Sequence, residues 1–315
     1  MSGIARNHHY LPQCYLSGFA RAVERKNSKP SVWVFDVSNG RRFPTSIRNI
    51  GAIRDFNRIE VDGHRPDVIE TLLSTIETDF ARVLSNMNND LRLPDDEGLT
   101  FLFNLIALIS SHNPSFREIH NRFQSDVLNQ MLGATLADEG RWLRQVERMK
   151  SEGIDVDETV NYEQMKSFYR EGAYTLEFEN THNLKLEFEA MDTILQTLVD
   201  RKWTLAIAPL SEGHFITCDY PASLTWTNDA LASGPYPPGH GMKDTLLTFP
   251  ISSRLAMLGE FEGTERCLEL SRDQIAAINS TIAAYAIKQI YSSMSKVPIM
   301  SPMGVIEMNK FKKRG

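Results

Sequence analysis

The stretch "DDEGLTFLFNLIALISSHNP", residues 95–114, decides how the rest of the sequence is interpreted. From Leu99 onward nearly every position is apolar, and the run ends at Asn113 and Pro114. The apolar run is shorter than the roughly 20 residues that a helix needs to cross a bilayer. A helix that is apolar on nearly all sides is buried among other elements. The stretch therefore predicts the central helix of a helical layer.

Helical spacing of apolar residues continues on both sides of this central helix. The upstream segment, from about Pro66 to Val83, repeats apolar residues every three or four positions. Downstream, the sequence predicts helices over about 115–136, 138–150 and 184–200. The helical middle thus covers about residues 66–200, as a candidate subdomain within a single domain over 1–315.

Strand patterns occupy both ends of the chain. "SVWVFDV" (31–37) is β-branched and aromatic, and Asn39 and Gly40 suit a tight turn, which together predict a hairpin from about Val32 to Phe43. After residue 200, short apolar stretches alternate with Gly and Pro, which is strand composition. A helix capped by Ser271 follows these strands. We therefore expect an α+β fold: a helical central layer packed on a small mixed or antiparallel sheet built from N- and C-terminal segments.

Composition narrows the class of protein. With 315 residues and 42% hydrophobic residues, the chain can bury a sizeable core. The N-terminus is polar and no long apolar segment is present, so we expect a soluble cytoplasmic protein without a membrane partner. Its three cysteines are an odd number at wide spacings, which predicts reduced thiols. A net charge of −6 neither requires nor excludes nucleic acid, because a local basic patch can coexist with it.

Two adjacent histidines stand out in "RNHHYLPQCYLSGFA", residues 6–20. Pro12 suits the first position of a short helix, which places His8 and His9 just before its N-terminus. The positive end of a helix favours neutral imidazole, the form that a general base or a metal ligand requires. The alternative is a capping and packing role for the pair.

A second candidate lies in "GHFITCDYP", residues 213–221, where an apolar strand ends at Asp219. A carboxylate at a strand end can face a cleft, with Thr217 beside it. The alternative is that Asp219 accepts backbone amides in a turn before Pro221. The apolar strand favours packing over nucleophilic chemistry for Cys218.

A third candidate is Arg117, in the first turn of the helix that follows Pro114. It either clamps an anionic substrate or pairs with a carboxylate such as Glu77. The break at Pro114 argues against a metal site shared by His112 and His120. The absence of a phosphate-binding glycine loop and of the G-x-G-x-x-G, H-E-x-x-H and G-x-S-x-G motifs argues against several familiar enzyme classes.

Residues 8–20, "HHYLPQCYLSGFA", resemble the amino-terminal pattern of a bacterial family, domain of unknown function 4238: His-His-Tyr-x-Pro-Gln running into Tyr-Leu-x-x-Phe. The resemblance continues almost to the end of the chain, in "IRNIGAIRDFN", "VIETLLSTIETDFA", "NPSFRE", "HFITCDYPA", "FPISSRLAML" and "INSTIAAYAIKQIYSS". The sequence departs from the family pattern at Cys218 and Tyr220, where Ser and Asn are usual, and at His112, where Arg is commoner. The resemblance implies one full-length domain without an agreed activity, and it argues against Cys218 as an essential nucleophile.

The leading hypothesis brings these candidates to one cleft. His8, His9, Gln13 and Asp219 are the predicted catalytic residues. Arg117 and Thr217 are predicted to bind substrate, and His9, Glu77 and Asp219 to hold Mg²⁺, Mn²⁺ or Zn²⁺. This combination suits a nuclease-like hydrolase of phosphodiester bonds, with nucleic acid or a nucleotide as its partner.

The rival hypothesis belongs to another class of protein. In a noncatalytic effector, nucleotide sensor or protein-interaction module, the same polar residues would be structural. The Pro- and Gly-rich loop from Ala232 to Met242 would then be a surface for a protein partner.

Overall fold

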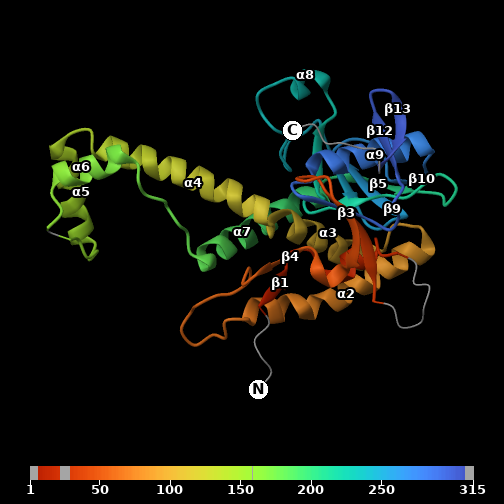
Figure 1. Cartoon of the computed structure of the whole chain (residues 1–315), viewed down its shortest axis with the longest axis horizontal. Coiled ribbons are helices and arrows are strands. Elements are labelled where there is room, and N and C mark those ends of the chain that lie inside the picture. The colour runs from red at the N-terminus through yellow and green to blue at the C-terminus, as the bar shows by residue number, and fades with distance from the viewer. Residues whose placement is uncertain (1–5, 22–28, 158, 309–315) are drawn as a thin grey trace. The chain divides into compact units, whose positions relative to one another are not determined.

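The computed structural model describes residues 6–21, 29–157 and 159–308, and its fold is α+β (Figure 1). The chain divides into two compact units, residues 1–116 together with 180–315 and residues 117–179. The sheets lie in the first unit, and the second is helical. No helix within these described ranges is both long and apolar enough to span a bilayer.

A five-stranded sheet forms the centre of the first unit. Its strand order is β10-β5-β9-β8-β7, and only the β10–β5 pair is parallel. The strands are β5 (Lys202–Ile207), β7 (Ser223–Trp226), β8 (Thr245–Pro250), β9 (Leu255–Glu260) and β10 (Arg266–Glu269). The strand composition seen after residue 200 in the sequence is therefore confirmed.

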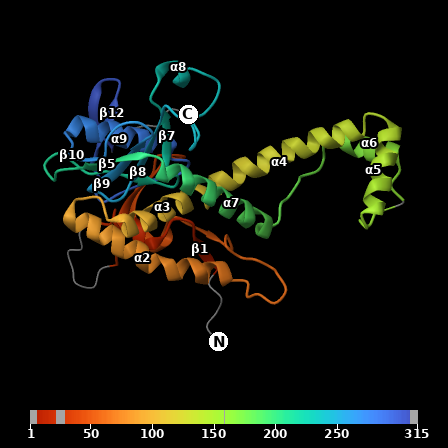
Figure 2. The ribbon, with the colours of Figure 1, turned by 180° about the vertical axis from the view of Figure 1, so that it is seen from behind.

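The two faces of this sheet are covered by different helices (Figure 2). Because side chains alternate along a strand, Trp203 and Leu205 of β5 enter the main core with α3 (Asp96–Ser111). Ala206 lies between Leu205 and Ile207 in β5, so its side chain points to the opposite face of the sheet. There it joins a smaller cluster with Ile275 of α9 (Arg272–Tyr285). The large side chains thus face the predicted central helix, which is buried along its second half as expected.

A four-stranded sheet joins the two ends of the chain. Its order is β3-β2-β11-β6, with every pair antiparallel. The strands are β2 (Ser31–Asp36), β3 (Arg42–Ser46), β6 (Thr217–Cys218) and β11 (Gln289–Ser292). The predicted hairpin and the predicted sheet shared by N- and C-terminal segments are both confirmed.

Other elements complete the first unit. Helix α2 (Val68–Asp90) buries Phe80, Val83, Leu84 and Met87 along its second half, whereas Leu72 and Ile76 of the predicted apolar stripe are exposed. Helix α7 (Asn180–Val199) packs along α3. The smaller elements are β1 (Asn7–His9), α1 (Gln13–Ser17), η1 (Ile47–Asn49), β4 (Ala52–Arg54), α8 (Asp229–Ala232), β12 (Pro298–Ser301) and β13 (Gly304–Glu307).

The second unit consists of α5 (Glu139–Ser151), α6 (Tyr162–Glu171) and most of α4 (Pro114–Thr135). The Tyr162 hydroxyl donates to the Leu136 carbonyl at 3.0 Å, which ties α6 to the end of α4. The compact helical unit is therefore narrower than the 66–200 region of the sequence prediction, because α2, α3 and α7 belong to the first unit.

Candidate functional site

The histidine pair lies in a short strand that leads into a helix. Strand β1 pairs with β4 antiparallel, and the Gly51 carbonyl accepts the backbone N–H groups of Tyr10 and Leu11 at 2.9 and 3.1 Å. Gly51 has φ of +61°, and a Cβ on it would lie 2.8 Å from the Leu11 Cβ. Only glycine therefore fits at position 51, and its carbonyl holds the segment that connects β1 to α1.

His8 and His9 point to opposite faces because they are neighbours in a strand. His8 is 1% exposed, and its Nδ1 accepts the backbone N–H of Asn57 at 2.8 Å. This ring nitrogen is committed to the protein backbone. The pair therefore does not form a joint site for one ion, and His8 has a structural contact where a catalytic role was predicted.

Of these two adjacent histidines, His9 has a ring nitrogen without a hydrogen-bond partner among the described residues. Its ring donates a hydrogen bond to the Arg48 carbonyl, while Nε2 is buried and has no partner among the described residues. The hydrogen therefore lies on Nδ1 and the lone pair on Nε2. Burial lowers the His9 pKa, although the charge of Glu70 and the Arg48 bond oppose the shift. The imidazole is thus neutral near pH 7, with an available lone pair.

Asn57 connects this strand to α2. Its side-chain amide donates to Glu70 Oε2 at 2.6 Å, and the residue is fully buried. Its Oδ1 has no hydrogen-bond partner in the described part of the chain. Buried polar atoms are nearly always paired, so a missing partner at this atom indicates a place for a ligand or water.

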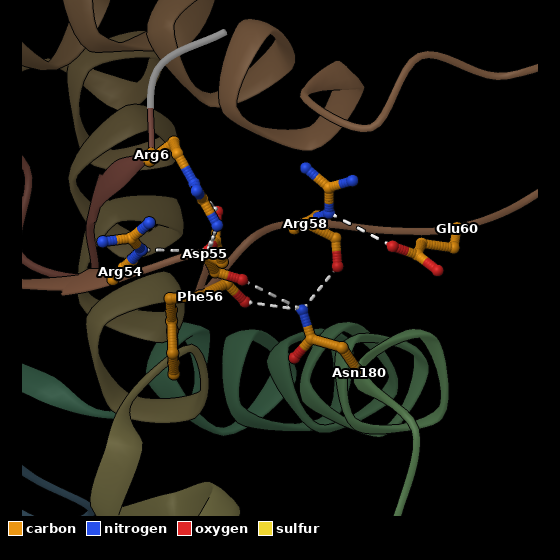
Figure 3. Close-up of polar contacts among 7 residues, drawn as sticks. All are labelled: Arg6, Arg54, Asp55, Phe56, Arg58, Glu60 and Asn180. Carbon is orange, nitrogen blue, oxygen red and sulfur yellow. Dashed lines mark hydrogen bonds and ion pairs between the residues drawn. The ribbon is translucent and has the colours of Figure 1, made fainter.

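The loop that carries Asn57 is fixed from two sides (Figure 3). The amide nitrogen of Asn180 lies 3.4, 3.0 and 2.5 Å from the carbonyl oxygens of Asp55, Phe56 and Arg58. Arg6 forms a two-bond ion pair with Asp55, at 3.2 and 2.7 Å. Asp55 adopts a left-handed φ of +56°, a conformation that persists only where neighbours hold it. The Asn57 side chain is therefore positioned by the loop before any ligand arrives.

Glu77 lies two turns along α2 from Glu70, on the same helix face. Its carboxylate accepts the backbone N–H of Cys14 at the start of α1, where Pro12 offers no side-chain cap. Burial raises the Glu77 pKa, and the charge of Glu70 raises it further. The two carboxylates therefore repel each other, and a cation between them would relieve that repulsion.

We refer to His9, Asn57, Glu70 and Glu77 as the acceptor cluster. Its free atoms are an imidazole lone pair, an amide oxygen and carboxylate oxygens, all of which accept hydrogen bonds or bind cations. Within the described ranges, no three His, Cys, Asp or Glu side chains are placed together to hold a metal ion. Mg²⁺ commonly uses only one or two protein carboxylates and keeps several waters, and Glu70 and Glu77 are carboxylates of that chemistry.

A buried His–Glu pair packs against Phe56. His112 Nδ1 is 2.7 Å from Glu187 Oε2, with both side chains almost fully buried. The His112 ring packs against Phe56 with centroids 5.0 Å apart, and its Nε2 has no partner within the described residues. The predicted break between His112 and His120 is confirmed, since α3 ends at Ser111 and α4 begins at Pro114.

Asp219 is held in a backbone-binding role. Its carboxylate accepts the N–H groups of Ile287, Lys288 and Gln289 at 2.8, 2.7 and 3.1 Å. Burial raises the Asp219 pKa, while these three bonds lower it. The contact matches the alternative in which Asp219 accepts backbone amides, although the amides come from residues 287–289, at the start of β11, and not from the turn at Pro221. Its roles as catalytic residue and metal ligand remain predictions.

The other predicted residues are dispersed. Thr217 is fully buried, and its hydroxyl lies 2.7 Å from the Tyr15 hydroxyl. Gln13 is the partly exposed first residue of α1. Arg117 is the first residue of the second unit, whereas the acceptor cluster belongs to the first. Within the predicted set, His9 and Glu77 each feel the charge of Glu70, and Glu70 is hydrogen-bonded to Asn57.

Glu70 and Glu187, which the sequence prediction did not single out, carry weak signals in the sequence. Glu70 precedes Glu77 by seven residues, which is two helical turns, so both belong to one face. Glu187 occupies an otherwise apolar helical stripe with Leu184, Met191 and Ile194, where a charged residue is unusual. Asn57 offered no such periodic signal.

Comparison of the sequence with known proteins gives one match. The sequence model of a family described as protein of unknown function (DUF4238) matches residues 7–296. The chain belongs to the DUF4238 family. No curated protein and no solved structure shows a significant match. The DUF4238 match includes β1, α2 and the strands around Asp219, so it covers every residue of the acceptor cluster.

Proposed function

We propose that this DUF4238 protein is a nuclease-like hydrolase of phosphodiester bonds, with His9 as its general base. The observation that carries the proposal is the buried, unpaired Nε2 of His9, fixed as an acceptor by the Arg48 carbonyl. A neutral imidazole oriented by a second hydrogen bond is the usual form of a general base. The free cysteines Cys14, Cys218 and Cys267 support a cytoplasmic setting within the same proposal.

The chemical step follows from this geometry. His9 Nε2 takes a proton from water as the water oxygen bonds to phosphorus, and the ester P–O bond breaks with protonation of the leaving oxygen by solvent. Asn57 holds Glu70 by its 2.6 Å hydrogen bond and thereby orients that carboxylate.

Two carboxylates beside an anionic substrate require a counter-charge. Glu70 and Glu77 would hold a divalent cation, Mg²⁺ or Mn²⁺, with water completing its ligands. When bound, the cation neutralises phosphate charge and polarises the phosphoryl oxygen.

The test measures hydrolysis of DNA, RNA and nucleotides with Mg²⁺, Mn²⁺, Zn²⁺ or EDTA. Removal of a general base costs about 10²–10⁴ in rate, so His9→Gln should lose at least about 100-fold, and Glu77→Gln should lose metal-dependent activity. His64→Gln, which changes an exposed histidine, is the matched control. Equal activity of wild type and His9→Gln would refute the assignment, as would absence of hydrolysis by wild type with every metal.

A second candidate is the noncatalytic nucleotide sensor or protein-interaction module. The observation in its favour is that His8, Thr217 and Asp219 each bind groups of the protein itself. Such a sensor would show ligand-dependent thermal stabilisation without turnover. Stabilisation of both wild type and His9→Gln by one nucleotide, with no product formed, would favour this function.

A further inference from the structure

The second unit carries a basic surface that the proposed hydrolase site does not use. Arg141, Arg144 and Arg148 lie at i, i+3 and i+7 on α5, so they share one helix face. They line a surface hollow of about 370 Å³ together with Gln145, Ala134 and Thr135. The lining contains three positive charges and no carboxylate, in a chain whose net charge is −6.

These arginines are available to a ligand. Arg141 and Arg148 form exposed ion pairs with Asp138 and Glu152, at 3.0 and 2.8 Å. Exposed pairs of this kind contribute only about 0–1 kcal/mol, so they exchange readily for another anion. No ion pair of Arg144 is found within the part of the chain that the structure describes.

The spacing of the three guanidinium groups suits a repeating anion. Seven residues of helix rise about 10 Å, and a duplex carries one phosphate per strand for each roughly 3.4 Å of its axis. A helix that lies along the duplex axis would therefore pass about three phosphates of one strand. Arginine also forms two-bond contacts with phosphate oxygens. A row of arginines along one helix face therefore matches a nucleic acid backbone better than a single phosphate.

A membrane surface fits this helix less well. A helix that lies in a bilayer inserts its apolar face and places basic residues around it. The apolar residues Trp142, Val146 and Met149 of α5 are half-buried within the protein, and Leu143 is the one exposed apolar side chain of this helix, so α5 has no free apolar face to insert. The arginines point away from that packed face.

We propose that the α5 arginine face binds the phosphodiester backbone of a nucleic acid. This site goes beyond the proposed hydrolytic function, because binding at α5 requires neither His9 nor catalysis. The contacts are to phosphate, so the site contributes affinity and little sequence preference.

The test measures binding of fluorescein-labelled single-stranded DNA, duplex DNA and RNA by fluorescence anisotropy. The full chain carries His9→Gln and the buffer contains EDTA, so that hydrolysis does not interfere. Each phosphate contact adds about 0.7–0.9 to the slope of log K against log salt. The triple variant Arg141→Ala, Arg144→Ala, Arg148→Ala should therefore flatten the slope by about 2 to 3, and Arg144→Glu alone should weaken binding at low salt.

The matched control is Arg92→Ala, Arg170→Ala, Arg266→Ala, which removes the same charge from exposed arginines elsewhere. Flattening in the α5 variant alone supports the site, even if the wild-type protein hydrolyses nothing. Equal loss in both triple variants would overturn it, because net charge would then explain the binding. Absence of binding to any nucleic acid, or binding only to phosphatidylserine vesicles, would overturn it as well.

Discussion

Replacing Asp219 by asparagine tests whether this carboxylate holds the fold or performs chemistry. The side chain keeps its size, but one of its two acceptor oxygens becomes an NH₂ group. If NH₂ takes the place of Oδ1, it faces the Ile287 N–H, and if it takes the place of Oδ2, it faces the N–H groups of Lys288 and Gln289. At least one partly buried N–H therefore loses its acceptor in either orientation.

The expected loss of unfolding free energy follows from these contacts. An unsatisfied buried donor costs about 1–3 kcal/mol, and hydrogen bonds to a charged acceptor are worth more than those to a neutral one. One lost bond and weaker remaining bonds give about 2–4 kcal/mol for Asp219→Asn. Asp219→Ala removes all three acceptor contacts and should cost more.

Urea unfolding followed by tryptophan fluorescence measures this loss. In a Trp142→Phe background the remaining tryptophans, Trp33, Trp203 and Trp226, all belong to the first unit, so the signal reports that unit alone. Asp62→Asn, at an exposed turn, is the matched control. A change below about 0.5 kcal/mol in Asp219→Asn, within the range of an ordinary surface substitution, would refute the structural role. Loss of hydrolysis without loss of stability would restore the catalytic prediction.

Three further predictions concern stability. Burial and the charge of Arg201 lower the pKa of His240 to about 4. The folded state therefore favours neutral His240. The unfolding free energy should fall by at most about 3 kcal/mol as the pH drops from about 6.5 to about 4. His240→Gln should flatten that dependence in acid titrations of stability, and an unchanged slope would contradict it. Gly51→Ala should destabilise the protein more than Gly40→Ala. Both glycines have a positive φ (+61° and +71°), but only at Gly51 does the added Cβ have a neighbour within 4 Å. Equal midpoints of urea unfolding for the two variants would refute the steric argument. Asn180→Ala should lower the unfolding free energy by about 1–2 kcal/mol and speed hydrogen exchange of the backbone amides at residues 55–58, because it removes the donor to three carbonyls of that loop. Unchanged exchange at these amides would show that Arg6 alone holds the loop.

The helices and the chain-end sheet could be predicted because their signals are local. Apolar spacing located α2, α3 and α7, and the Asn39–Gly40 turn located the first hairpin. Helix α6 was missed although Asn161 and Gln164 form a capping box at its start. That box is a recognisable sequence signal, but α6 is only 10 residues long and buries only Tyr162.

The candidate site was harder to predict, because it depends on pairing between distant segments. The sequence singled out His9 and Glu77, but the contact between Asn57 and Glu70 requires the β1–β4 pairing, which follows from no local pattern. Likewise, the three amides that bind Asp219 lie about 70 residues further along the chain. A sequence indicates which residues are unusual, and the fold alone decides what each one contacts.

The second unit leaves and rejoins the first at two residues that share a neighbour. His112, just before α4, packs its ring on Phe56, and Asn180, at the start of α7, donates to the Phe56 carbonyl. The 117–179 segment is thus an excursion flanked by two residues of the first unit, His112 and Asn180, that contact the same amino acid. Evolution can lengthen, shorten or exchange such a module while the rest of the chain keeps its architecture, so relatives of this protein should vary most in this segment.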